Sequence, residues 1–288
     1  MKKKPTTAGP FLKWAGGKRK QVSYLSRKLP AGQRLVEPFV GAGAVFMGTD
    51  YDAYLLADTN QDLIDLYHIL ISDGQNFVRY ARHFFNAHNS TEARYYQLRE
   101  QFNEMTQGTP YRAALFLYLN RHGYNGLCRY NSAGGFNVPF GAYRKPYFPD
   151  AELIAFRVKV LQRDVRIVCQ DFRTTFAQLQ GGDVVYCDPP YIPISQTAHF
   201  TGYTGKGFGE TDQRELAQLA REAAAADIPI VINNHSHPVM NRLYRQAGAA
   251  MSYKRQGRSI NSDSARRGGV VESTASWNIG PITNRKAA

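Results

Sequence analysis

Apolar positions in the first part of the chain form two short runs and then a helical repeat. The run LVEPF leads into the glycine-rich stretch VGAGAV within residues 33–45, and a second run over residues 54–57 ends at Asp58. Four apolar side chains follow at the three- and four-residue spacing of an amphipathic helix, namely Leu63, Leu66, Tyr67 and Leu70. This order predicts strand, tight turn, helix, strand and helix, which is the beginning of an α/β fold.

The middle of the chain differs in composition and pattern from the first part. Residues 74–149 mix helical patterns with many aromatic and basic side chains, and residues 120–149 are rich in Gly, Asn, Pro and Tyr. We interpret this part as an insertion between two halves of an α/β domain.

The strand pattern returns in the second half. Apolar runs over residues 166–169, 183–187 and 228–232 end at Asp171, Asp188 and Asn233 in turn. The last two are β-branched runs of the kind that a parallel sheet buried on both faces requires.

Three further segments complete the expected organisation. An alanine-rich helix is predicted over residues 211–226, with Thr211 as its N-cap. Residues 259–269 are polar and basic, as in a mobile loop, and residues 270–279 are expected to form a last strand.

Charge changes this picture by indicating a class of partner. The 288 residues include 36 Lys and Arg against 23 Asp and Glu, which gives a formal net charge of +13. Such an imbalance favours polyanions, with nucleic acid as the leading candidate, although a basic charge alone also serves solubility.

Location and covalent chemistry follow from what the chain lacks. Cys128, Cys169 and Cys187 are odd in number and widely spaced, which argues against a disulfide framework and against paired zinc ligands. The polar N-terminus does not match a secretory signal, and no apolar run is long enough for a membrane helix. We therefore expect a cytoplasmic protein with no bound metal and no membrane contact.

The glycine-rich turn is a candidate cofactor site. Gly41 and Gly43 follow the first strand, and Asp58 ends the next one, where a carboxylate can accept hydrogen bonds from ribose hydroxyls. The full GxGxxG pattern is absent, which disfavours NAD and favours an uncharged thioether nucleoside. After the third strand, Asp171 could hydrogen-bond the amino group of an adenine and Phe172 could stack on its ring. Each of these features, the glycine turn and the strand end, also occurs in proteins that bind no ligand there.

Asp188, Pro189, Pro190 and Tyr191 form the sharpest motif, because they follow a central strand where open α/β sheets bind ligands. An aromatic amine is a poor nucleophile, so a catalyst must hold its nitrogen and aim the lone pair at a methyl donor. The Asp188 carboxylate and the Pro189 carbonyl could accept the two amino hydrogens, while Tyr191 offers a face to a base that has left the duplex. Cys187 lacks the setting of a cytosine-C5 nucleophile, and zinc deamination has no ligand set.

Several longer stretches occur in the order of a known family: FLKWAGGK, VEPFVGAG, LLAD, FLYLNRHGYNGLCRYN, FNVPFG, KPYFP, VVYCDPPY and residues 193–200. With them, nearly the whole chain resembles the Dam-type adenine-N6 DNA methyltransferases of the D12 class. The resemblance implies a Rossmann-like S-adenosylmethionine-dependent methyltransferase sheet with an inserted, mainly helical DNA-recognition domain. The expected division is a catalytic part over residues 1–62, the insertion over residues 63–144 and a second catalytic part over residues 145–288.

The resemblance also implies roles for individual residues. It assigns Trp14, Lys18, Asp58 and Asp188 to the S-adenosylmethionine site, with Phe39 and Gly41 in the glycine turn. The residue patterns described above add Gly43, Asp171 and Phe172 to the expected site. The target would be GATC in double-stranded DNA. The residues implied to contact bases, or to fill the gap left in the duplex by the flipped base, are Lys13, Tyr124, Leu127, Arg129 and Pro139. Arg129 is the candidate for bidentate binding of guanine, although an isolated arginine in a basic protein often contacts phosphate instead. Apart from the resemblance, four polar residues could position the DNA backbone in a generic way, namely Asn120, Arg121, Asn125 and Asn131. Tyr143 and Ser195 complete the expected DNA contacts.

The chain departs from the family pattern at two places. Ala142 stands where a basic residue is usual, so one phosphate contact is expected to be missing. Residues 270–277 are more polar than the usual last strand. Neither place touches the expected chemistry.

Alternatives remain open at this level. The same fold could methylate cytosine N4, or it could bind DNA without catalysis, and RNA or a protein amide would be further substrates. The family implies a monomer without an obligatory protein partner, in a bacterium or encoded by a phage.

Overall fold

A seven-stranded mixed sheet forms the centre of the protein. The computed structural model describes residues 9–18, 21–191, 208–256 and 270–279, and within these ranges the strand order is β3-β2-β1-β4-β5-β7-β6. The strands are β1 Arg34–Glu37, β2 Ala53–Asp58, β3 Asp164–Cys169, β4 Asp183–Cys187, β5 Ile230–His235, β6 Ala250–Gln256 and β7 Val270–Trp277. The first five strands are parallel, and β7 runs antiparallel between β5 and β6.

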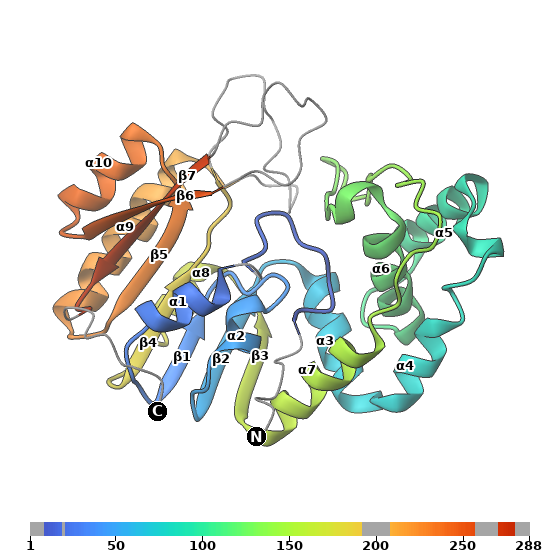
Figure 1. The fold of residues 1–288 in the computed structure, drawn as a ribbon, viewed down its shortest axis with the longest axis horizontal. Coiled ribbons are helices and arrows are strands. Elements are labelled where there is room, and N and C mark those ends of the chain that lie inside the picture. The colour runs from blue at the N-terminus through green and yellow to red at the C-terminus, as the bar shows by residue number, and fades with distance from the viewer. Residues whose placement is uncertain (1–8, 19–20, 192–207, 257–269, 280–288) are drawn as a thin grey trace, which may run out of the picture.

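Helices cover both faces of this sheet (Figure 1). They are α1 Val22–Lys28, α2 Ala44–Gly48, α3 Gln61–Asp73, α4 Gln75–Arg82, α5 Glu92–Glu104, α6 Pro110–His122, α7 Asp150–Gln162, α8 Phe172–Phe176, α9 Glu210–Ala225 and α10 Pro238–Gln246, with short 3-10 turns η1 His88–Ser90 and η2 Tyr124–Gly126. The apolar side chains of α1, α2, α3 and α7 share one core cluster, and those of α8, α9 and α10 share the other.

Neighbouring residues of one strand enter opposite clusters. Leu35 of β1 and Leu56 of β2 belong to the first cluster, whereas Val36 and Leu55 belong to the second. Side chains alternate across a strand, so a strand between two helical layers must be apolar at successive positions. The continuous apolar runs of the sequence have this cause, and all of β4 is buried.

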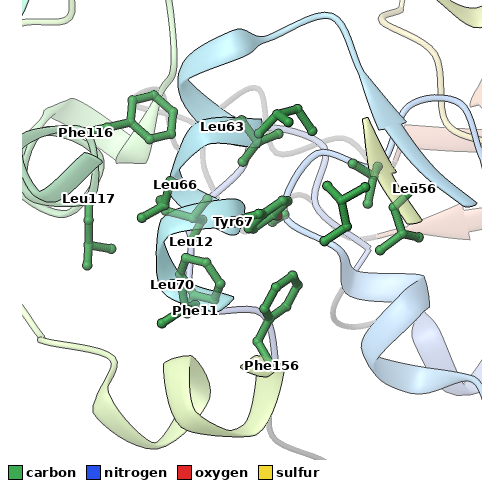
Figure 2. Close-up of a cluster of buried hydrophobic side chains, with 14 of the residues drawn as sticks. Phe11, Leu12, Leu56, Leu63, Leu66, Tyr67, Leu70, Phe116, Leu117 and Phe156 are labelled. Carbon is green, nitrogen blue, oxygen red and sulfur yellow. The ribbon is translucent and has the colours of Figure 1, made fainter. Parts of the chain in front are cut away.

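The helical middle of the chain packs on the sheet layer through α3. Figure 2 shows Leu66 and Leu70 of α3 with Phe116 of α6 in a single apolar cluster that also includes Leu56 of β2. The boundary expected after residue 62 therefore falls inside α3, whose side chains serve both parts. The division into two catalytic parts and an inserted domain stays a prediction.

Most expected elements are present, with differences at their ends. Strands are confirmed at residues 54–57, 166–169 and 183–187, and the last expected strand is β7. The strand expected over residues 228–232 is instead β5, which extends to His235 because its far end pairs with β7. The expected N-cap Thr211 is wrong, since α9 begins at Glu210 and the amide of the preceding Gly209 donates to Asp212 at 2.8 Å.

Helices α1, α7, α8 and α10 and strand β6 were not predicted. Strand β6 and helix α10 lie in a part of the chain that is polar at many positions, and β6 is stabilised by its pairing with β7. The loop expected over residues 259–269 lies outside the described residues.

Candidate active site

Four polar side chains meet at the carboxyl edge of the parallel strands. Glu37 ends β1, Asp58 ends β2 and Asp188 directly follows β4. Asn233 lies in the neighbouring strand β5. This edge is where open α/β sheets bind their ligands. The fold thus brings together the two aspartates that the sequence marked as cofactor and catalytic residues.

Asp188 lies in a compact cluster with Lys18 and Tyr191. The Nζ atom of Lys18 is 3.0 Å from Oδ1 of Asp188, and the Tyr191 hydroxyl donates to the same oxygen at 3.1 Å. Lys18 also donates to the Tyr191 hydroxyl and, at 3.0 Å, to the carbonyl of Gly16. The Lys18 side chain is only 3% exposed. A residue expected to line the cofactor pocket therefore directly contacts the carboxylate that the sequence predicts to be catalytic.

Two opposing effects act on the charge of Asp188. Burial raises the pKa of its carboxyl above the ordinary range, while the charge and hydrogen bond of Lys18 lower it. Lys18 thereby favours the ionised carboxylate, which is the form that can accept a hydrogen bond from an amino group. Burial also raises the pKa of the Cys187 thiol, which does not suit a nucleophilic cysteine.

Burial and a hydrogen bond to a neighbouring helix fix the two prolines of the motif. Pro189 is buried, and the carbonyl of Pro190 accepts a hydrogen bond from Gln213 of α9 at 3.1 Å. Gln213 is fully buried and also accepts from the Tyr244 hydroxyl at 2.8 Å. Proline restricts the backbone, so this support fixes the loop that carries Asp188.

A further polar network behind Tyr191 was not predicted from the sequence. Asn233 hydrogen-bonds Tyr191 and donates to Glu272 of β7 at 3.2 Å. Glu272 also accepts from Gln21 at 2.7 Å. The position of Asn233 at the end of a predicted strand was a usable signal, whereas nothing local to Glu272 indicates its proximity to the site.

The glycine-rich turn has the geometry expected of a close approach. Gly41 and Gly43 have φ angles of 47° and 68°, which favour glycine. A Cβ atom on Gly41 would lie 2.7 Å from Nε1 of Trp14, so the indole packs directly on the turn. The Tyr67 hydroxyl donates to the Gly41 carbonyl at 2.5 Å and fixes the other side.

Asp58 is joined to the same turn. Its Oδ2 accepts from the Gly41 amide and its Oδ1 from the Asn60 amide, both at 3.0 Å. Burial raises the pKa of Asp58, and these amide donors oppose the shift. Glu37 lies nearby on β1 with burial raising its pKa to about 8, and its Oε1 has no hydrogen-bond partner within the described residues.

The residues after β3 are engaged differently from expectation. Asp171 caps α8 by accepting from the Arg173 amide at 2.9 Å and is also ion-paired with the Arg173 side chain at 3.1 Å. Phe172 is 2% exposed and stacks on Phe39 with ring centroids 5.6 Å apart. One face of Phe172 is thus taken by Phe39, so stacking of a ligand on that face does not fit this arrangement.

Several expected DNA contacts lie at the surface near η2. Tyr124, Asn125, Asn131 and Pro139 are exposed, and Leu127 is half-buried. The hydroxyl of Tyr143 accepts from the amide of Asn125 at 2.9 Å. Ser195 lies outside the described residues.

Arg129 is oriented by a partner that the sequence did not indicate. Its Nε donates to Oδ1 of Asn137 at 2.7 Å, and one terminal nitrogen donates to the Asn137 carbonyl at 3.2 Å. Asn137 is neutral, so the positive charge of Arg129 is not balanced by this contact. A guanidinium oriented in this way suits bidentate binding of an acceptor pair.

Asn120 and Arg121 require a correction, because both are interior residues. Asn120 is 1% exposed and bonds the backbone of Lys13, while Arg121 is 8% exposed and donates to the carbonyls of Phe11 and Tyr147. Burial of this extent does not fit the direct DNA contacts expected of them. Their polar groups instead join the last turn of α6 to other parts of the chain.

The described residues offer neither a membrane span nor a metal site. No helix in the described ranges has the length and apolar character needed to cross a bilayer. Among the same residues, no group of three His, Cys, Asp or Glu side chains is placed to hold a metal ion.

Comparison with known proteins shows which family the sequence matches. Residues 14–259 match the family model of the D12 class N6 adenine-specific DNA methyltransferases. The chain is 52% identical over 239 residues to the DNA adenine methylase of Serratia marcescens, covering 82% of this chain and 87% of that protein. Identity is 47% over 263 residues with the Vibrio cholerae enzyme of the same name, covering 91% and 93% of the two chains. For the Escherichia coli K12 enzyme it is 45% over 276 residues, covering 96% and 98%.

Proposed function

The chain belongs to the D12 class of N6 adenine-specific DNA methyltransferases, and on that premise we propose how it binds its donor, its base and its site. Methylation of adenine N6 in DNA is the activity of this family, so cytosine N4 methylation and silent DNA binding are not supported. The proposed donor is S-adenosylmethionine, the proposed substrate is an adenine that has left duplex DNA, and the proposed site is GATC.

The donor proposal is supported by the residues around the glycine turn. Asp58 has carboxylate lone pairs available beside Gly41 for ribose hydroxyls, and the indole of Trp14 closes the turn. The three buried acidic groups Glu37, Asp58 and Asp188 lie near two ammonium groups, that of Lys18 beside Asp188 and that of Lys159 near Glu37. Such a surplus of acidic groups suits a donor that carries a positive sulfonium.

The proposed chemistry follows from Asp188. The donor supplies a methyl group whose carbon–sulfur bond breaks with the electron pair remaining on sulfur. Asp188 accepts a hydrogen bond from the amino group and thereby aims the N6 lone pair at that methyl carbon. Because Asp188 would hold the amino group by a hydrogen bond, its carboxylate is also the proposed acceptor of the proton that N6 loses. Lys18 keeps Asp188 ionised before the transfer.

The proposed DNA contacts lie in η2 and the residues that follow it. A base inside the duplex cannot reach Asp188, so the adenine must rotate out of the stack. We propose that Tyr124 and Leu127 occupy the gap, which is supported by the exposure of the Tyr124 ring and the partial exposure of Leu127. Arg129, held by Asn137, would bind the guanine of GATC. We expect a monomer acting in the cytoplasm, as the family resemblance implies.

The single observation that carries this proposal is the Lys18, Asp188 and Tyr191 cluster at the carboxyl end of β4. The purified protein is incubated with tritiated S-adenosylmethionine and two short duplexes that differ only in having GATC or a scrambled site. Label on the GATC duplex alone, recovered as N6-methyladenine after digestion, is the expected result. Label on both duplexes would contradict the site, and recovery as N4-methylcytosine would contradict the target base.

A further inference from the structure

The N-terminal segment, defined as residues 11–18, contacts three parts of the proposed machinery. Its Lys13 lies against η2, its Trp14 packs on the glycine turn at Gly41, and its Lys18 pairs with Asp188. In Figure 1 the dark blue segment runs between the sheet and the green helix α6. Trp14 is the next residue after Lys13, so a shift of the backbone at one of them displaces the other.

Asn120 fixes the backbone of this segment. It lies in the last turn of α6, where its Oδ1 accepts from the Lys13 amide at 2.9 Å and its Nδ2 donates to the Lys13 carbonyl at 2.7 Å. The same Nδ2 is 3.3 Å from the carbonyl of Gly126 in η2. One buried amide therefore satisfies both backbone polar groups of Lys13, as a neighbouring strand would.

Close packing reinforces these bonds. Gly126 has a φ of 62°, and a Cβ atom added there would lie 2.2 Å from Cβ of Lys13. The adjacent Arg121 donates to the carbonyl of Phe11 at 3.4 Å. The Nζ atom of Lys13 then lies 4.0 Å from the centroid of the Tyr143 ring. The position of Lys13 is thus set by α6 and η2.

We propose that Asn120 is a positioning residue, which joins the DNA-facing turn η2 through the N-terminal segment to the glycine turn and to Lys18. Asn120 does not contact DNA in this arrangement, and it acts through Lys13 and Trp14. The inference rests on the proposed function for the roles of Trp14 and Lys18, and it adds a residue to which that function assigns no role. It implies that loss of the Asn120 bonds weakens cofactor binding even when no DNA is present.

The first test is Asn120→Leu, which keeps the volume of the side chain and removes its hydrogen bonds. Binding of S-adenosylhomocysteine without DNA is followed by tryptophan fluorescence, and methyl transfer is measured in a single turnover with excess enzyme. We expect about tenfold weaker binding and slower transfer, the effect of one or two buried hydrogen bonds on an equilibrium constant. Wild-type values for both measurements in a folded variant would overturn the proposal.

Asn103→Leu is the matched control. Asn103 makes the same kind of contact, accepting from the Phe136 amide at 2.8 Å and donating to its carbonyl at 3.2 Å, but it does not touch the N-terminal segment. We expect its binding of S-adenosylhomocysteine to equal that of the wild type. An equal loss in both variants would mean that any damage to the helical region has this effect, and would overturn a specific role for Asn120.

A second pair of variants decides the matter if Asn120→Leu does not fold. Gly126→Ala places a methyl group against Lys13, whereas Gly108→Ala meets nothing within 4 Å at a similar φ of 76°. Both positions have a positive φ, so backbone strain is common to the two variants, and only the first is expected to weaken S-adenosylhomocysteine binding. Equal binding by the two would overturn the proposal.

The wild-type protein separates this inference from the proposed function. If it bound no S-adenosylhomocysteine, the proposed donor would be wrong. If it bound this compound and both Asn120→Leu and Gly126→Ala bound it equally well, the donor would stand and only the role of Asn120 would fall.

Discussion

Lys18 and Asp188 form an ion pair with 3.0 Å between Nζ and Oδ1, although one lies near the N-terminus and the other follows β4. The Lys18 side chain is almost fully buried and that of Asp188 is 20% exposed, so water screens the pair weakly. The N-terminal segment is thereby part of the proposed catalytic site, and the charge of Asp188 depends on it.

The acid limb of the pH–rate profile should report this pair. Burial raises the pKa of Asp188 and Lys18 lowers it, and only the ionised carboxylate is active, so activity is lost as the pH falls through that pKa. Lys18→Met removes the lowering effect, and the acid limb of kcat should move to higher pH. Lys18→Arg keeps the charge and should retain more of the wild-type profile. An acid limb unchanged in Lys18→Met would contradict the coupling.

Asp188→Asn should separate catalysis from DNA binding. The amide keeps the shape of the side chain but cannot accept hydrogen bonds with both of its polar atoms or receive a proton. We expect kcat to fall at least about 100-fold, as for the loss of one oriented group at a reacting centre. Affinity for duplex DNA, measured by filter binding, should stay near the wild-type value because phosphate contacts supply most of it. A parallel loss of affinity would speak against this separation.

Arg129→Ala should reduce discrimination at the guanine of the proposed site. A bidentate arginine–guanine contact contributes about 1–3 kcal/mol of discrimination against a wrong base. The measurement is the ratio of kcat/KM for GATC to that for a duplex with this guanine replaced. Arg144 is exposed, and Arg144→Ala is the control that should leave the ratio unchanged. An unchanged ratio in Arg129→Ala would assign guanine recognition to another residue.

The buried ion pair between Asp62 and Arg112 should matter for stability. Nε of Arg112 is 2.6 Å from the carboxylate of Asp62, which also accepts from the Tyr130 hydroxyl at 2.7 Å. Arg112→Met leaves a buried carboxylate without its cation, which typically costs about 3–5 kcal/mol of unfolding free energy. Urea unfolding measures this loss.

A surface pair provides the comparison. Arg163 contacts Asp50 and Asp52, whose side chains are 82% and 95% exposed. Arg163→Met should cost no more than about 1 kcal/mol, because water and salt screen exposed pairs. Similar losses in Arg112→Met and Arg163→Met would show that burial does not set the contribution of the inner pair.

The sequence by itself determined the local features of this protein. Runs such as residues 54–57 and 183–187 predicted strands because a sheet buried on both faces needs apolar side chains at successive positions. The glycine turn and the motif from Asp188 to Tyr191 were recognisable because their chemistry is carried by adjacent residues. The family match over residues 14–259 agrees with the resemblance seen in those motifs.

Tertiary structure decided the contacts between distant residues. Asn120 looked like a DNA contact because asparagine is polar, yet the fold buries it against Lys13, where its amide satisfies a backbone that would otherwise lose hydrogen bonds. Glu272 reaches Asn233 only because β7 pairs antiparallel with β5. Periodicity records which face of an element is buried, but the partner of a buried polar group is fixed by long-range packing, which adjacent residues do not encode.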